Sequence, residues 1–313
     1  MSSCLVIGET IIDGIRDPQG DLVEYPGGSA ANVAIGLARL GRSVDLATWF
    51  GPDPHGAVVR TNFKVNDVRV VPGSDRAERT STAVATIDHA GSATYEFDMD
   101  WRVPEVHLDS SVRVVHTGSI AITLQPGADG VVEILRVASE FSTIFYDPNL
   151  RPTIMGEVST VAPRVEDLVS VADVVKVSDE DLLWLYTDVE ASEVARRWAT
   201  QGPAVVIVTK GDAGAFATSA TGVEVEVPAP AVQVVDTVGA GDSFTAGLID
   251  RMWTSDLVGA DRRTYLQAID QATLTEIVQW AIHCAAVTVS RAGADPAHRN
   301  EVEDLAQEAS TDD

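Results

Sequence analysis

Apolar runs of strand length alternate with amphipathic segments along most of the 313-residue chain. The runs are rich in Val and Ile, and the segments between them carry apolar residues at helical spacing. We therefore predict strands at residues 5–8, 44–50, 113–117, 143–146, 174–177 and 204–209. The predicted helices are residues 30–40, 127–141, 179–186 and 192–199. This alternation is typical of an α/β protein with a mainly parallel sheet wrapped by helices.

Two stretches do not follow the alternation. Residues 11–25 hold Asp-Gly and Asp-Pro turn signals between short strand pieces. Residues 80–101 hold alternating pieces on either side of His89, Ala90 and Gly91. We interpret both stretches as antiparallel strands of a small lid over the sheet, the alternative being two surface hairpins.

The pattern changes again in the C-terminal third of the chain. Two short runs within residues 214–227 predict a hairpin. Residues 264–291 predict a long helix with a break near Ala272. The acidic, turn-rich residues 301–313 predict a frayed tail.

Composition limits the partners and the compartment. The chain is 45% hydrophobic and 22% charged, with a formal net charge of −25. A surface this acidic repels nucleic acid and anionic membranes, so we expect neither as a partner. Cys4 and Cys284 stand in apolar runs without disulfide or metal spacing, which favours reduced core thiols in a cytosolic protein. We expect no signal peptide and no transmembrane span.

The most informative segment is DTVGAGDSF, residues 236–244. The apolar residues 231–235 predict a strand leading into it, and the residues after it predict a helix. Between them Gly239, Ala240 and Gly241 form a tight turn whose N–H groups, with the helix dipole, would attract an anion such as phosphate. Asp242, in the first helical turn, would take the proton of a hydroxyl that attacks phosphorus. The alternative is a glycine-rich loop with a helix-capping aspartate.

A second segment, GGSAANVAIGLARLG, occupies residues 27–41. Two glycines precede a helix whose small residues permit close packing. Asn32 lies in the first turn of this helix. Its amide can make two directed hydrogen bonds, either to a ligand or locally at the helix start.

Together the two segments closely resemble the signature regions of the ribokinase-like (pfkB) carbohydrate kinase family. GETIID (residues 8–13), FYDPNLRP (145–152) and VIVTKGDAGAF (206–216) add to the resemblance, which is greatest to fructokinases and 2-keto-3-deoxygluconate kinases. It spans roughly residues 5–296 and implies that GETIID belongs to the first strand. The implied architecture is a three-layer ribokinase-like domain at residues 1–297, with its lid at about 11–25 and 80–101 and an acidic tail at 298–313.

The resemblance implies a sugar site made by Asp13, Gly28, Asn32 and Arg151. Asp13 would accept hydrogen bonds from two adjacent hydroxyls, although Asp-Gly is also a hairpin turn signal. The guanidinium fork of Arg151 suits a carboxylate substrate or a phosphate, the alternative being a surface salt bridge. Phe97 or Trp101 would close the pocket from the lid, unless these aromatic side chains belong to the core of the lid.

The resemblance also implies sites for ATP and metal ions. No Walker A lysine motif is present, so the nucleotide would be held by the family's own arrangement, here Lys176, Ser178, Thr209, Gly211, Gly214 and His283. Lys176 would supply positive charge toward ATP, the alternative being an exposed lysine at a strand end. Ser178 and Asp181 replace the Asn and Glu of the family's N-x-x-E element, which orders magnesium through water, or they simply cap a helix. The positions that hold a monovalent cation such as potassium in many relatives are Asp236, Val238, Arg291 and Gly293. The segment around Gly293 equally fits an ordinary helix end.

The expected protein is therefore a cytoplasmic, ATP-dependent sugar kinase that phosphorylates a primary hydroxyl of a small keto sugar. Fructokinase is the first expectation, with 2-keto-3-deoxygluconate kinase and then ribokinase as alternatives. The resemblance implies a homodimer formed through the lid. The alternative from another class is a non-catalytic sugar or nucleotide sensor on the same fold, which would have no need to keep Asp242.

Overall fold

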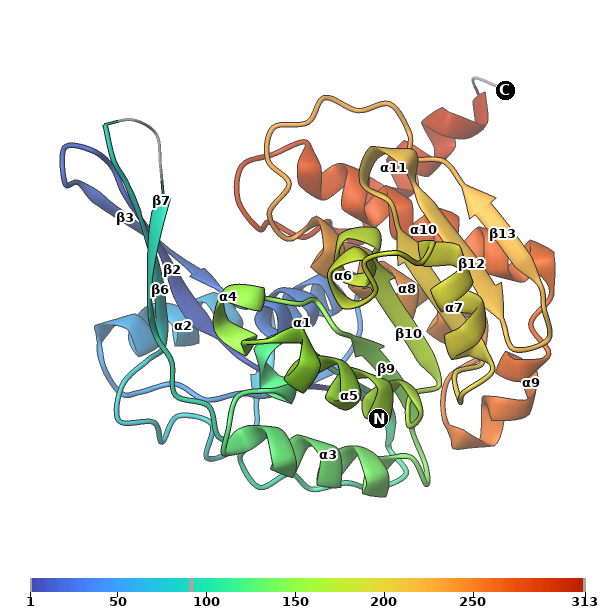
Figure 1. Cartoon of the computed structure of the whole chain (residues 1–313), viewed down its shortest axis with the longest axis horizontal. Helices are drawn as coiled ribbons and strands as arrows, with labels where there is room; N and C mark the ends of the chain where they lie inside the picture. The colour runs from blue at the N-terminus through green and yellow to red at the C-terminus, as the bar shows by residue number, and fades with distance from the viewer. Residues whose placement is uncertain (1, 90–92, 312–313) are drawn as a thin grey trace.

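The computed structural model describes residues 2–89 and 93–311, so Ala90 and Gly91 of the predicted lid turn lie outside the described residues. Figure 1 shows a large body of helices and strands, with a thin sheet rising from one side of it. Within the described residues the body contains a nine-stranded sheet in the order β13-β12-β11-β10-β9-β8-β1-β4-β5. Its strands are β1 Ser3–Ile7, β4 Val44–Ala47, β5 Arg69–Val70, β8 Val112–Gly118, β9 Thr143–Asp147, β10 Val174–Ser178, β11 Val205–Thr209, β12 Ala215–Ser219 and β13 Glu224–Val227.

The sheet is parallel from β5 to β11 and turns antiparallel at β12 and β13, which form the predicted hairpin. Its central strands are buried on both faces, as expected for a parallel sheet covered by helices. The helices are α1 Ser29–Arg39, α2 Pro54–Val65, α3 Gly127–Ala138, α4 Pro152–Met155, α5 Val158–Val169, α6 Asp179–Leu185, α7 Ala191–Ala199, α8 Ala240–Thr254, α9 Arg263–Gln267, α10 Gln271–Val289 and α11 Arg299–Thr311. Short 3₁₀ turns form at η1 Ser119–Ile122, η2 Gly211–Ala213 and η3 Ala260–Arg262.

The core has two halves, one on each face of the sheet. Val205 and Ile207 of β11 pack with α1, α8 and α10, whereas Val206 and Val208 pack with α3, α5 and α7. Successive side chains of a strand point to opposite faces, so the single strand serves both halves. This arrangement confirms the predicted three-layer α/β fold.

Helix α10 is long and apolar enough to cross a membrane by length and composition, but 56% of its apolar window is buried inside the protein. It packs against α8 at very close range, since a Cβ on Gly247 would lie 2.7 Å from the Cys284 sulfur. The apolar character of α10 is therefore explained by its place in the core. The predicted interruption of this helix is also present, at residues 268–270 between α9 and α10.

The lid is a four-stranded sheet, β3-β2-β6-β7, formed by β2 Ile11–Arg16, β3 Leu22–Gly27, β6 Thr82–Ile87 and β7 Ala93–Asp98. Each predicted stretch forms an antiparallel pair, β2 with β3 and β6 with β7. The two pairs join through β2 and β6, which are parallel, because the chain returns to the body between them and enters the lid twice from the same side. One detail of our prediction was wrong. Residues 8–13 are not one strand, since β1 ends at Ile7 and Asp13 belongs to the lid strand β2.

Two further predictions were wrong on local structure. Residues 231–235 form no strand and run as an exposed loop after the edge strand β13, with Val235 N–H donating to the Val289 carbonyl at the end of α10. Residues 299–311 form helix α11 and not a turn-rich tail. Val302 is fully buried, and Arg299 donates to the Asp250 carboxylate at 2.6 Å, so packing and a charged hydrogen bond outweigh the acidic composition of α11.

Candidate active site

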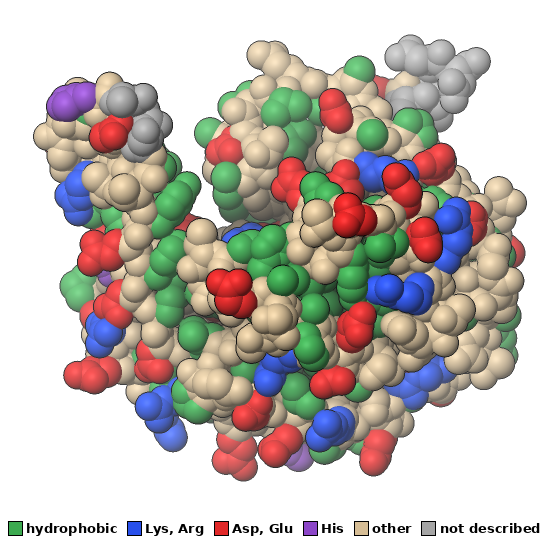
Figure 2. Space-filling model, viewed as in Figure 1, with side chains coloured by type: hydrophobic (Ala, Val, Ile, Leu, Met, Phe, Trp, Pro, Cys, Tyr) green, Lys and Arg blue, Asp and Glu red, His purple; other side chains and the backbone are tan. Residues whose placement is uncertain are grey.

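Loops from four neighbouring strands meet at one edge of the body sheet. Strands β10, β9, β8 and β1 are adjacent and parallel, so the residues that follow each of them lie at the same carboxyl edge. In open α/β sheets this edge is where ligands bind. Figure 2 shows the lid separated from the body by a notch, with hydrophobic side chains along the flank of the lid that faces the body.

Asp242 lies in the first turn of α8 and is 7% exposed. Its Oδ1 accepts hydrogen bonds from the Ser29 hydroxyl at 2.6 Å and the Asn149 amide at 3.3 Å, and its Oδ2 accepts one from the Asn32 amide at 2.8 Å. Burial raises the pKa of the Asp242 carboxyl above its usual range, while the Ser29 and Asn32 donors act in the opposite direction. The carboxylate is thus fixed by three side chains from α1 and the loop after β9.

A buried ion pair lies beside this carboxylate. Lys176 Nζ is 3.0 Å from Asp147 Oδ2, and the Thr245 hydroxyl also donates to that oxygen at 3.2 Å. The same ammonium lies 3.0 Å from the position that a Cβ on Gly241 would take. Lys176, predicted from the resemblance to face ATP, therefore places its charge directly beneath the small-residue turn.

The turn itself is closed by two loops that meet. Gly239 is the N-cap of α8 with φ of 77°, a left-handed conformation that favours glycine, and a Cβ there would lie 2.8 Å from the Ala294 Cβ. Asp236 joins the loops, since its oxygens accept the Val238 N–H at 3.1 Å and the Gly293 N–H at 2.9 Å. These backbone donors hold the pKa of Asp236 below its usual range.

The predicted cation residues are therefore brought together. The guanidinium of Arg291 is paired with the Glu301 carboxylate of α11, to which it donates at 2.9 Å.

On the sugar side, Asp13 belongs to β2 and Arg151 to the loop after β9, and the Arg151 charge acts on the Asp13 carboxyl. Burial is the main cause that raises the pKa of Asp13 to about 6, with the Arg151 charge lowering it and the Asp242 charge raising it. Arg151 is exposed and donates to the Asn149 side chain at 2.7 Å, with no salt bridge among the described residues. Gly28 begins α1 against the lid, and a Cβ there would lie 2.6 Å from the Glu9 carbonyl oxygen.

The segment that replaces the N-x-x-E element behaves as a helix cap. Ser178 is the N-cap of α6 and its hydroxyl accepts the Asp181 N–H at 3.0 Å. Asp181 is tied to the loop after β9, because Oδ1 accepts the Leu150 N–H at 3.1 Å. Burial, and then the Asp147 charge, raise the pKa of Asp181. The capping alternative describes Ser178 well, whereas the Asp181 carboxylate faces the shared edge of the sheet.

The residues predicted to surround adenine have fewer contacts with the cluster around Asp242. Thr209 ends β11, and Gly211 and Gly214 bracket the 3₁₀ turn η2 that leads into β12. His283 is buried in α10, which packs against β12, and burial lowers its pKa. The structure puts these residues on neighbouring elements, and no hydrogen bond among the described residues links His283 to the turn.

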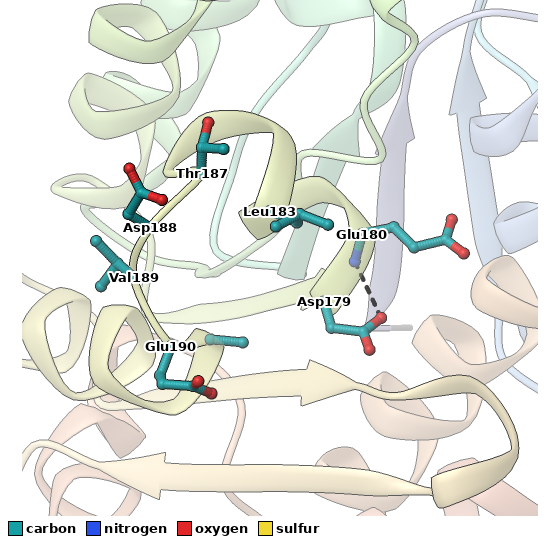
Figure 3. Close-up of a pocket in the computed structure, with 8 residues that line it drawn as sticks. Asp179, Glu180, Leu183, Thr187, Asp188, Val189 and Glu190 are labelled. Atoms are coloured by element: carbon teal, nitrogen blue, oxygen red, sulfur yellow. Dashed lines mark hydrogen bonds between the residues drawn. The ribbon is translucent and has the colours of Figure 1, made fainter.

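A surface hollow of ≈ 440 Å³ lies elsewhere on the body, beside α6 and the connection to α7 (Figure 3). Four of its lining side chains are carboxylates, those of Asp179, Glu180, Asp188 and Glu190. Such a lining repels phosphate, and none of the predicted site residues belongs to it. It is therefore no candidate for the nucleotide site.

Five residues of the cluster escaped our prediction. They are Glu9, Ser29, Asp147, Asn149 and Thr245, each within reach of a neighbour in the network around Asp242. Asp147 and Asn149 stand in the FYDPNLRP segment, so its two polar residues other than Arg151 were a usable signal. Ser29 is an ordinary helix-start residue and Thr245 lies within the predicted helix after the motif, and nothing in the pattern marks either of them.

The site combines a carboxylate fixed in the first turn of a helix with a small-residue turn and a buried ammonium. Such a site can take the proton of a hydroxyl while that hydroxyl attacks a bound anion such as phosphate. The family comparison agrees with this class: a model of the pfkB family carbohydrate kinases matches residues 1–300. The chain belongs to the pfkB family and is a carbohydrate kinase, a phosphotransferase that acts on an alcohol group.

Within this family, the chain is similar to several fructokinases. A fructokinase of Klebsiella pneumoniae is 32% identical over 255 residues, covering 78% of this chain and 82% of the relative. The structure of a Xylella fastidiosa fructokinase with bound ATP has a TM-score of 0.84 and 25% identity, covering 98% and 99% of the two chains. A Vibrio cholerae fructokinase with fructose, ADP and calcium bound has a TM-score of 0.74 and 28% identity, covering 96% of each chain. A double mutant of that fructokinase was solved with fructose, ADP and a potassium ion.

Proposed function

We propose that this carbohydrate kinase is a fructokinase that transfers the γ-phosphoryl group of ATP to a primary hydroxyl of fructose. The observation that carries the proposal is the buried Asp242 carboxylate beside the turn at Gly239, in a chain whose relatives are fructokinases. A non-catalytic sensor would have no use for a carboxylate that three donors keep in place.

In this proposal Asp242 accepts the proton of the attacking hydroxyl, and the oxygen of that hydroxyl forms the new bond to phosphorus as ADP leaves. The N–H groups of Gly239, Ala240 and Gly241 stabilise the charge on the transferring group, with Lys176 beneath them. Asp13, Gly28, Asn32 and Arg151 hold the sugar between lid and body.

Nucleotide and metal sites complete the proposal. Lys176, Ser178, Thr209, Gly211, Gly214 and His283 would contact ATP. Magnesium, when bound, neutralises phosphate charge and would be held through water by Asp181, whose carboxylate faces the strand edge. A potassium ion would lie between the loops of Val238 and Gly293, where the Asp236 oxygens each keep lone pairs beyond one backbone hydrogen bond.

We also propose a homodimer through the lid in the cytoplasm. The lid face that carries Asp13 is apolar and exposed: Ile15, Tyr25 and Tyr95 are 51%, 56% and 61% exposed. A monomer rarely leaves such a face open to water, and a second copy of the chain would cover it.

The test measures ADP release with ATP and magnesium, with and without potassium, over fructose, 2-keto-3-deoxygluconate, ribose, tagatose and fructose 6-phosphate. We expect turnover with fructose, and a loss of roughly 100- to 10,000-fold in Asp242→Asn. The exposed Asp188→Asn is the matched control, with unchanged turnover expected. Preference for 2-keto-3-deoxygluconate would contradict the fructose assignment and make Arg151 the partner of its carboxylate. Sugar binding without turnover would favour the sensor.

A further inference from the structure

Asp242 would act as a base only if its carboxylate is both aimed and ionised. Two side chains that contact it, those of Ser29 and Asn149, have no role in the proposed reaction. Both donate to the same oxygen, Oδ1, at 2.6 and 3.3 Å, and the Asn149 amide also donates to the Ser29 hydroxyl at 2.7 Å. The three side chains thus form a closed triangle of hydrogen bonds on one side of the carboxylate.

The backbone around this triangle is unusual. Asn149 has φ of 39°, a left-handed conformation that residues other than glycine adopt rarely. Ser119, after the neighbouring strand β8, has φ of 52° and donates its N–H to the Pro148 carbonyl. Non-glycine residues held in such conformations gather at functional sites, because surrounding contacts must hold them there. Here the conformation directs the Asn149 amide at Ser29 and Asp242.

Glu9 holds Ser29 in place through the backbone. The Ser29 N–H donates to Glu9 Oε1 at 3.2 Å in the first turn of α1, where the helix dipole favours a negative charge. Glu9 is 6% exposed, and Oε2 has no hydrogen-bond partner among the described residues. Burial raises the pKa of Glu9 to about 7, and its hydrogen bond to the Ser29 N–H ties this buried carboxyl to the start of α1.

We propose that Ser29 and Asn149 are positioning residues that aim the Asp242 carboxylate and keep it ionised, with Glu9 fixing Ser29. The proposal rests on the proposed role of Asp242 as the base. Donors to a carboxylate stabilise its charged form, so removing either donor destabilises that form. The remaining oxygen, Oδ2, receives only the Asn32 amide among the described residues and is the one left to accept the substrate proton.

The test is the pH dependence of kcat/KM in Ser29→Ala and Asn149→Gly. Loss of a donor raises the pKa of Asp242, and the base works above its pKa, so the acid limb of the profile moves to higher pH. We expect a move of about one to two pH units for Ser29→Ala, and a smaller one for Asn149→Gly because its hydrogen bond is longer. At neutral pH the misaimed base should also reduce kcat/KM by roughly 10- to 100-fold.

Other charges act on Asp242 from neighbouring elements and stay in place in both variants. Asp147 at the end of β9 raises the pKa of Asp242 and Lys176 on β10 lowers it, while Asp13 on β2 is coupled to Asp242 by charge repulsion. Asn62→Ala on α2, whose side-chain oxygen accepts a hydrogen bond from the Asn66 amide away from the site, is the matched control and should keep the wild-type profile. Because glycine relieves the left-handed strain at Asn149, Asn149→Gly should leave the melting temperature unchanged or higher.

The outcomes distinguish the positioning role of Ser29 and Asn149 from the role of Asp242 as the base. A purely structural role would lower the melting temperature and leave the acid limb where it is, which would overturn the proposal. If Asp242→Asn abolishes turnover but Ser29→Ala and Asn149→Gly keep the wild-type profile, the positioning role is wrong and the base is retained. If the wild-type protein turns over no sugar, the function and the positioning role are both refuted.

Discussion

The turn that begins α8 depends on a glycine at position 239, and this dependence can be measured. Gly239→Ala forces a Cβ into a left-handed conformation with φ of 77°, which costs about 1–2 kcal/mol. The new Cβ would also lie 2.8 Å from the Ala294 Cβ and 3.0 Å from its Cα, closer than such atoms approach. Relieving that overlap costs a further ~1–3 kcal/mol.

Gly222→Ala is the matched control. Gly222 has φ of 85°, and a Cβ there meets nothing within 4 Å, so the control carries the conformational cost alone. It lies in the turn between β12 and β13, outside the cluster around Asp242. The difference between the two variants therefore isolates the crowding against Ala294.

The assay is urea unfolding followed by the fluorescence of the six tryptophans, with kcat measured beside it. We expect Gly239→Ala to lose about 2–5 kcal/mol and Gly222→Ala about 1–2 kcal/mol of the free energy of unfolding. Turnover should fall in Gly239→Ala, because the loop must shift its N–H groups, and stay at the wild-type level in Gly222→Ala. Equal losses of stability, or full turnover in Gly239→Ala, would refute the reasoning.

The buried ion pair and the lid face give two more predictions. Lys176→Met leaves Asp147 buried without its partner and should lower the free energy of unfolding by about 3–5 kcal/mol. Adding Asp147→Leu should restore most of this stability in urea unfolding but no turnover; equal losses in the single and double variants would contradict the pairing. Tyr95→Asp should convert a lid dimer to monomer in sedimentation velocity, whereas Val65→Asp, exposed on α2, should not. A dimer that survives Tyr95→Asp would place the interface elsewhere.

The body of the fold could be predicted because its signals are local. Strand β11 is an almost continuous apolar run, and α1 shows its helical spacing over a single segment. The features that the sequence did not reveal depend on partners that lie far apart in the chain. The parallel pairing of β2 with β6 joins segments about 70 residues apart, beyond any local pattern. Helix α11 is stabilised by Arg299 reaching Asp250 and by burial of Val302, which composition does not reveal.

The same distinction applies to the site. Asp242 and the turn at Gly239 stand in one motif, so sequence alone brings them together. Ser29 is 213 residues from Asp242, and Lys176 is 29 residues from Asp147, so both contacts exist only once the sheet has formed. Sequence marks the group that would do the chemistry, because its type is rare at that place. It does not mark the groups that hold it, because a serine at a helix start and an asparagine in a loop are common for other reasons.

The acidic character of the chain and its proposed ATP site are compatible for a physical reason. A net charge of −25 acts mostly through exposed carboxylates, whose fields are screened over about 8 Å at physiological salt. Lys176 is 5% exposed, so its charge acts on Gly241 and Asp242 with far less screening. Asp147 keeps that ammonium paired, and the same pair acts on Asp242 with opposite signs. One buried pair can thus place a positive charge beside the incoming phosphate, whatever the sign of the outer surface.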